Sequence, residues 1–211
     1  LSADPYSDLT FNPETAEGFE LGLKSTILDN QLRANISVFT YKYSDFQVDF
    51  FNSSVFAFNT LTADAKTKGV ELELEYAPRS VPGLNITAAV NYNDAKYSSF
   101  PEGPCYSGQT QAEGCNVLLA NGQYRQNLSG ASLSVAPKWT GMVGLNYETT
   151  VGSDFMIGFN GNIRYSDGYN PSAFANPIAY QSKYASIDAG LRFGAEDGNW
   201  QLALIGKNLT N

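Results

Sequence analysis

Hydrophobic and polar residues alternate one by one along much of this chain. The pattern is clearest from Pro137 to Tyr169, a stretch that the turn Val151-Gly152-Ser153-Asp154 divides into two halves. In each half, apolar residues and glycines occupy every second position: Trp139, Gly141, Val143, Leu145 and Tyr147, then Phe155, Ile157, Phe159, Gly161, Ile163 and Tyr165. A period of two is typical of a β-strand whose two faces differ. The stretch therefore predicts a hairpin of two antiparallel strands.

The same alternation predicts eight strands in total. They are expected at residues 16–28, 31–51, 70–76, 84–92, 139–148, 155–166, 185–193 and 200–207. In the second strand, Phe39, Tyr41 and Tyr43 have the parity of its polar residues, which makes their face ambiguous. Either a bulge or a ring of aromatic residues at a membrane surface would explain them.

The lengths of these strands favour a membrane protein. Strands in globular proteins usually have about five or six residues, whereas a strand tilted in a membrane barrel needs about ten to cross the apolar band. Aromatic residues bracket the apolar faces, as they do at the two lipid interfaces of such barrels. The predicted membrane-interface aromatics are Tyr76, Trp139, Tyr147, Phe155 and Tyr165. For a single hairpin, a long soluble β-sandwich would be the alternative.

The connections between the strands alternate in length. Short turns are expected at residues 29–30, 78–83, 151–154 and 197–199, and longer loops at 52–66, 98–133 and 168–182. An antiparallel up-and-down transmembrane β-barrel has short periplasmic turns at one end and longer extracellular loops at the other. A β-sandwich gives no reason for this asymmetry. The fold class predicted here is therefore all-β, a transmembrane barrel or part of one.

Charge and composition narrow the function. The 211 residues carry a net charge of −8 and include no His, so nucleic acid is not an expected partner, and the commonest general base and metal ligand is missing. Glu71, Glu73 and Glu75 share one face of a strand. Without a partner base they fit a solvated face or barrel lumen better than a catalytic site. We expect no enzyme activity, metal site or cofactor.

The longest loop contains both cysteines of the chain, Cys105 and Cys115. A disulfide formed in an oxidising compartment is favoured over half of a metal site, because there is no His and no further Cys. Four tyrosines lie in loops or near strand ends and are candidates for stacking on a ligand in an extracellular vestibule: Tyr106, Tyr124, Tyr169 and Tyr180. Packing within the loops or at the lipid interface is the alternative role.

Five short segments follow one another along the chain: Asn12-Pro13-Glu14 with Gly18-Phe19-Glu20-Leu21-Gly22-Leu23-Lys24, Lys68-Gly69-Val70-Glu71-Leu72-Glu73, Ala136-Pro137-Lys138-Trp139, Asp188-Ala189-Gly190-Leu191, and Trp200 with Lys207-Asn208-Leu209-Thr210-Asn211. In this order they resemble segments of the barrel of TonB-dependent outer-membrane receptors. The resemblance implies a 22-stranded barrel, of which residues 1–211 would be a partial domain of about eight strands, roughly the fourteenth to the twenty-first. The plug domain and the final strand are expected to lie outside this chain, and eight strands alone would leave two open edges.

The resemblance also implies a function and partners. The complete protein would lie in the outer membrane of a Gram-negative bacterium and take up a large scarce ligand, most often an iron–siderophore complex. Its partners would be the TonB complex, through the plug domain, the outer-membrane lipid and the small-molecule ligand. A passive porin-like or adhesin-like barrel is the alternative, and a soluble all-β binding module is a third.

Overall fold

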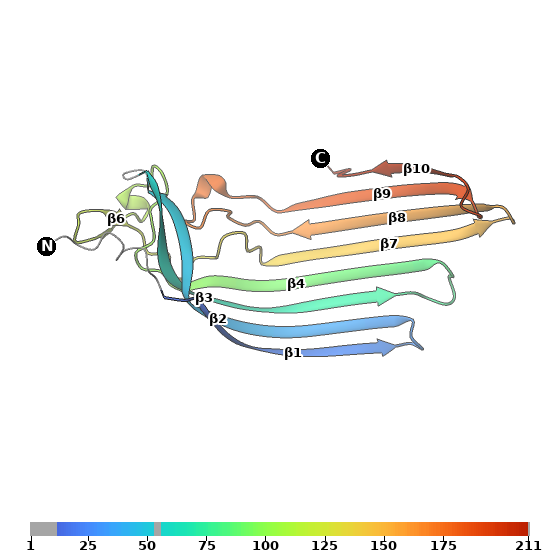
Figure 1. Ribbon diagram of the computed structural model, residues 1–211, viewed down its shortest axis with the longest axis horizontal. Coiled ribbons are helices and arrows are strands. Elements are labelled where there is room, and N and C mark those ends of the chain that lie inside the picture. The colour runs from blue at the N-terminus through green and yellow to red at the C-terminus, as the bar shows by residue number, and fades with distance from the viewer. Residues whose placement is uncertain (1–11, 53–55, 211) are drawn as a thin grey trace.

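The computed structural model describes residues 12–52 and 56–210, which form one antiparallel sheet with loops gathered at one end (Figure 1). In chain order and in spatial order its strands are β1 (Thr15–Ile27), β2 (Leu32–Asn52), β3 (Ala57–Tyr76), β4 (Leu84–Ser99), β7 (Trp139–Val151), β8 (Phe155–Ser166), β9 (Tyr184–Ala195) and β10 (Gln201–Gly206). β1 and β10 are the two edges of this eight-stranded meander. The predicted up-and-down order of eight strands is confirmed, and the sheet is open.

Short turns and long loops lie at opposite ends of the sheet, as predicted; we call these the turn end and the loop end (Figure 1). The first tight turn places Leu28, Asp29 and Asn30 at φ values of 55°, 54° and 67°. The turn before β4 packs closely on its neighbour: a Cβ added at Gly83 would lie 1.8 Å from the carbonyl oxygen of Glu148, so only glycine fits there.

The register of the paired strands places their apolar residues on the same face of the sheet. Val38 pairs with Val70, and Val70 pairs with Tyr92. Because residues directly opposite share a face of a sheet, the apolar positions of successive strands form one continuous apolar face. The alternate positions, which include Arg33 and Glu75, form a polar face.

The ambiguous aromatics of β2 lie on the polar face. The register between β2 and β3 runs without interruption from Leu32 to Tyr43, and it shifts only between Tyr43 and Phe46. A bulge is therefore present, with Asp45 at a φ of 55°, but it follows the three aromatics and does not explain them. Phe39, Tyr41 and Tyr43 keep the parity of Arg33, so they are not at the lipid-interface position that was the other explanation.

The prediction of a loop at residues 52–66 is wrong, because most of this segment belongs to a strand. β3 begins at Ala57, and the pairs Asn52↔Ala57 to Phe46↔Ala63 continue the hairpin, which bends away from the rest of the sheet (Figure 1). Alternation is present here, but its apolar members include the small Ala63 and Ala65, which give a weak hydrophobic signal. Their burial depends on contacts with distant segments.

The hydrophobic core lies at the loop end, where the long loops cover the strands. Elsewhere the described part of the chain forms a single layer, and no second layer covers its faces. The core cluster consists of Val48, Ala63, Tyr97, Phe100 and Leu128, with Phe46, Leu61, Ala131, Leu133, Ala173 and Phe174 packed against it. On the apolar face, by contrast, the side chains of Phe19 and Leu21 are 83% and 75% exposed. Such exposure in the sheet itself is what a lipid-facing surface requires.

The long loops have more structure than the sequence predicted. The first contains a short 3₁₀ helix, η2 (Gln111–Glu113), and a small hairpin of β5 (Val117–Leu118) and β6 (Tyr124–Arg125). The second contains η3 (Pro177–Ala179). In the described part of the chain, no helix is long and apolar enough to span a membrane.

Candidate functional site

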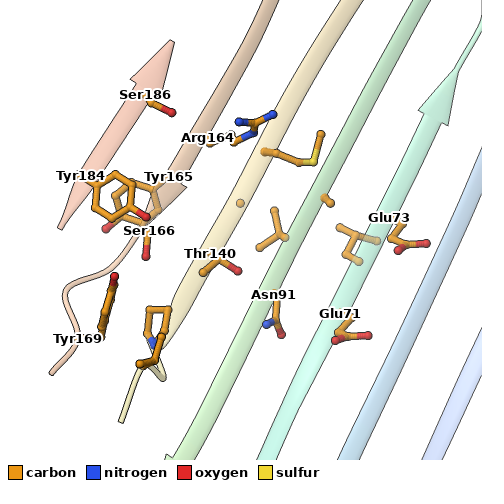
Figure 2. Close-up of a pocket in the computed structure, with 17 residues that line it drawn as sticks. Glu71, Glu73, Asn91, Thr140, Arg164, Tyr165, Ser166, Tyr169, Tyr184 and Ser186 are labelled. Atoms are coloured by element: carbon orange, nitrogen blue, oxygen red, sulfur yellow. The ribbon is translucent and has the colours of Figure 1, made fainter. Parts of the chain in front are cut away.

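The polar face carries an open cavity of about 680 Å³ near the loop end (Figure 2). Side chains from β3, β4, β7, β8 and β9 line it, together with residues of the two long loops. We call its polar lining the inner wall, which consists of Glu71, Glu73, Asn91, Thr140, Arg164, Ser166, Tyr169, Tyr184 and Ser186.

Strand register builds this wall as two rows that cross five strands. In the row nearer the loops, the pairs Glu71↔Asn91, Asn91↔Thr140, Thr140↔Ser166 and Ser166↔Tyr184 follow one another. In the next row, Glu73 leads through Ala89 and Met142 to Arg164 and Ser186. Each strand contributes one side chain to each row, because alternate residues of a strand share a face.

The charges of the wall are separated across it. The carboxylates of Glu71 and Glu73 are on β3, and the guanidinium of Arg164 is on β8 (Figure 2). The Arg164 guanidinium lies 3.8 Å from the Asp188 carboxylate. A polar ligand or a protein surface in the cavity would therefore meet acidic groups on one side and a basic group on the other.

The three carboxylates of β3 have partners on β2. Glu71 accepts a hydrogen bond from Ser37 over 3.4 Å, Glu73 accepts one from Asn35 over 3.4 Å, and Glu75 forms an ion pair with Arg33 at 3.1 Å. These cross-strand pairs account for the glutamates as part of a solvated polar face. Within residues 12–52 and 56–210, no three His, Cys, Asp or Glu residues are grouped so that they could hold a metal ion.

The two long loops are docked on each other above the wall. Gln126 is only 6% exposed, and its Nε2 donates to the carbonyl oxygens of Pro104 at 2.7 Å and Phe174 at 3.0 Å. Phe174 also packs edge-on against Phe50 of β2 with ring centroids 6.2 Å apart. The loop end of the sheet is therefore a packed rim rather than a set of separate loops.

A disulfide joins Cys105 and Cys115 within the first long loop, with the two Cα atoms 5.6 Å apart. Beside it, Thr110 and Glu113 form a capping box on η2, in which the Glu113 carboxylate accepts hydrogen bonds from the Thr110 N–H and hydroxyl, each at 2.8 Å. Both hydrogen bonds lower the pKa of Glu113 below its ordinary value, and the one from the Thr110 N–H has the larger effect.

Residues 2–209 match the sequence profile of the family described as "TonB dependent receptor-like, beta-barrel". The chain belongs to this family. Its apolar face is thus the outer face of the TonB-dependent receptor barrel, and its polar face, with the inner wall, lines the barrel interior. The eight strands are one part of a larger barrel that the open edges β1 and β10 would continue.

Solved structures of two receptors and a transporter share this fold. The siderophore receptor PiuA from Acinetobacter baumannii superposes with a TM-score of 0.65 at 21% identity, over 92% of this chain and 24% of its own. The ferric yersiniabactin uptake receptor FyuA from Yersinia pestis gives 0.64 at 14% identity, over 93% and 25%. The copper transporter OprC gives 0.60 at 16% identity, over 96% and 26%. The chain thus spans about a quarter of the length of each of these proteins.

The five predicted interface aromatics all lie on the outer face of the barrel, in two groups. Trp139 and Tyr165 are toward the loop end, and Tyr76, Tyr147 and Phe155 are toward the turn end. Three further aromatics lie at these levels and were not predicted as interface residues: Tyr92, Phe193 and Trp200. Tyr92 lies 4.8 Å from Trp139, and Phe193 lies 5.4 Å from Phe155 and 5.5 Å from Trp200, as measured between ring centroids. The apolar parity of Tyr92 and Phe193 was a signal that could have found them.

The structure separates the four candidate vestibule tyrosines. Tyr169 lines the inner wall, and its backbone pairs with Gln181, the neighbour of Tyr180, through two hydrogen bonds of 3.0 and 2.9 Å. Tyr180 is 56% exposed, and with Tyr169 it borders a second hollow between the loops. Tyr106 and Tyr124 lie in the other loop near the disulfide, where the Tyr124 carbonyl oxygen is 3.7 Å from Cys105 Sγ. The four candidates therefore form two separate pairs, one in each long loop.

Proposed function

We propose that the complete protein is an outer-membrane receptor of a Gram-negative bacterium that takes up a large scarce ligand with energy from the TonB complex. An iron–siderophore complex is the favoured ligand. Membership of the TonB-dependent receptor family is the observation that carries the proposal, and similarity of fold to PiuA and FyuA supports the ligand class. Because OprC, a copper transporter, has the same fold, the ligand requires a direct test.

The membrane location is supported by the outer face. Its exposed apolar residues lie between the two aromatic groups, and on β7 eight positions separate Trp139 from Tyr147. A tilted strand crosses the roughly 25 Å apolar band of an outer membrane in about ten residues. We assign Tyr76, Trp139, Tyr147, Phe155 and Tyr165 to the two lipid interfaces, where rings with one polar edge are favoured.

The inner wall and the docked loops form the path that we assign to the ligand. The wall offers carboxylates, hydroxyls, an amide and the Arg164 guanidinium, which suit a polar ligand or the surface of the plug domain through which TonB acts. Tyr169 lies at the boundary between the wall and the second loop, so it is the one of the four tyrosines placed to contact a ligand that has reached the wall. Tyr180 would contact the same ligand, while Tyr106 and Tyr124 would line the far side of the rim.

Uptake by cells tests the proposal. The full-length receptor is expressed in iron-limited cells with and without functional TonB, and the accumulation of a labelled ferric siderophore is measured per folded barrel. Active transport predicts accumulation only with TonB. Accumulation that does not change when TonB is lost would support the alternative, a passive porin-like barrel, and would refute the proposal.

Two variants locate the ligand path. Arg164→Gln in the wall should reduce uptake about tenfold or more, which corresponds to about 1.4 kcal/mol if the effect lies in binding. Arg192→Gln is its control: Arg192 is also on the polar face, 3.6 Å from Glu148 toward the turn end, and does not line the cavity. Tyr169→Ala should behave like Arg164→Gln. Equal uptake by all three variants would remove the wall from the ligand path.

A further inference from the structure

Four lysines lie side by side on the outer face, just beyond its last apolar residues toward the loop end. We call them the lysine belt, which consists of Lys42, Lys66, Lys68 and Lys96. Lys42 is directly opposite Lys66, and Lys66 is directly opposite Lys96, on three neighbouring strands. Lys68 is on the same face of β3, two residues closer to the apolar band.

The belt is not explained by the stability of the sheet. Like charges directly opposite each other on neighbouring strands are destabilising, and this chain has a net charge of −8 with only 13 basic residues in total. Four of those 13 are concentrated in one patch. Such a concentration of like charge is expected where an anionic partner compensates it.

Acidic residues of the chain compensate the belt only in part. Lys96 forms an ion pair with Asp94 at 2.8 Å, Asp94 is also directly opposite Lys68, and Glu17 pairs in register with Lys42. Among the described residues, no carboxylate lies within ion-pair distance of the ammonium groups of Lys42, Lys66 or Lys68. These three side chains are also exposed.

The position of the belt indicates the chemistry of the partner. A hollow of about 380 Å³ on the outer face is lined by Lys42 and Lys66, by the single carboxylate of Glu17, and by Phe19, Thr40 and Ser98. On the same face, the exposed side chains of Phe19, Leu21 and Val38 continue from this level toward the turn end. A partner that has an anionic head and apolar chains would satisfy both surfaces at once.

We propose that the lysine belt binds the phosphate groups of a lipid headgroup in the outer leaflet of the membrane. The inference rests on the proposed location in the outer membrane. With the loop end outside the cell, the belt lies at the level of the outer-leaflet headgroups, directly above the apolar band. Lysines near an anionic membrane surface are attracted to it, and their long apolar stems extend along the hydrocarbon boundary. The transported ligand is a poorer candidate, because the inner wall is on the opposite face.

Lipid retention by the purified receptor tests the inference. The full-length receptor is reconstituted in phosphatidylcholine vesicles that contain diphosphorylated lipid A, re-extracted in detergent, and analysed for lipid A per folded barrel by native mass spectrometry. Replacing Lys42, Lys66 and Lys68 together by Gln should reduce the retained lipid about tenfold or more. Lys24→Gln should retain the wild-type amount, because Lys24 is exposed on the polar face opposite Asn35.

Further variants distinguish the loss of a positive charge from a loss of folded structure. Lys66→Gln alone should give a partial loss of retained lipid, whereas Lys66→Arg, which keeps the charge, should retain the wild-type amount. These single variants keep the inference testable if the triple variant fails to fold. Wild-type retention by the triple variant would overturn the inference, as would equal retention of a dephosphorylated lipid A. Displacement of the lipid by millimolar inorganic phosphate would also overturn it, since it would identify a site for small anions instead.

The test is independent of transport. Retention is measured without ligand or TonB, so a receptor that fails the uptake experiment could still retain the lipid. Failure of the wild-type protein to insert into vesicles as a folded barrel would refute the membrane location itself, and it would be detected by gel migration that does not change on heating.

Discussion

The hydroxyl of Tyr97, at the end of β4, donates a hydrogen bond to the carbonyl oxygen of Ala173 in the second long loop, 3.5 Å away and 76 positions later in the chain. Tyr97 is 1% exposed and packs against Phe100 with ring centroids 5.0 Å apart. One side chain thus joins a barrel strand to both long loops. The loop end is stabilised by a core of its own.

Truncation of that core should loosen the loops without unfolding the sheet. Leu128 is 3% exposed, and replacing a buried Leu by Ala costs about 2 to 5 kcal/mol. We expect Leu128→Ala to increase hydrogen exchange and proteolysis in residues 100–133 and 168–182, while the strands between the aromatic groups stay protected. Leu118→Ala, at a side chain 61% exposed, is the control. Unchanged exchange in Leu128→Ala would show that the cluster contributes little.

Opposite faces of β4 should tolerate arginine very differently. Ala88 lies on the outer face opposite Val143, and Ala89 lies on the polar face opposite Met142 and Glu73. Near the middle of the apolar band, an outward arginine costs about 2 to 4 kcal/mol. Ala88→Arg should therefore lower the free energy of unfolding of the reconstituted receptor by that amount, and Ala89→Arg should change it little. Equal losses would contradict the assignment of the faces.

The disulfide should form in protein exported to the periplasm, because thiols are oxidised there. We expect peptide mapping without reductant to recover Cys105 and Cys115 in one linked peptide. Replacing both by Ser should increase exchange in residues 105–115, because the disulfide joins residues 10 positions apart and closing a loop of this size contributes slightly less than about 3 kcal/mol in the chain-entropy model. Recovery of Cys105 and Cys115 as free thiols from the exported receptor would contradict the prediction.

The stability of the first long loop should also depend on pH, through the ionisation of Glu113. Its pKa is lowered in the folded loop by the hydrogen bonds from Thr110, so its contribution to stability is complete above the unfolded pKa and is lost as pH falls through the lower folded pKa. Hydrogen exchange around η2 should rise at acidic pH in the wild type. Glu113→Gln should remove this part of the pH dependence, whereas Glu102→Gln, at an exposed residue of the same loop, should retain it.

The alternation of residues was sufficient to predict much of this fold. Side chains of a strand point to opposite faces whatever the strand packs against, so the two faces, the eight strands and the order of short and long connections follow from local sequence. The aromatic residues at the ends of the apolar faces follow in the same way. The extension of β3 to Ala57 was missed, because Ala63 and Ala65 carry little hydrophobic signal on their own.

The inner wall, the docked loops and the lysine belt were decided by the tertiary structure. Arg164 joins Glu73 in one row, and Lys42, Lys66 and Lys96 become neighbours, only through the register of paired strands. A shift of one residue would move each side chain to the other face. The burial of Tyr97 and Gln126 depends on loops far apart in the chain. A local pattern specifies which way a side chain points, but contacts between distant segments determine what it meets there.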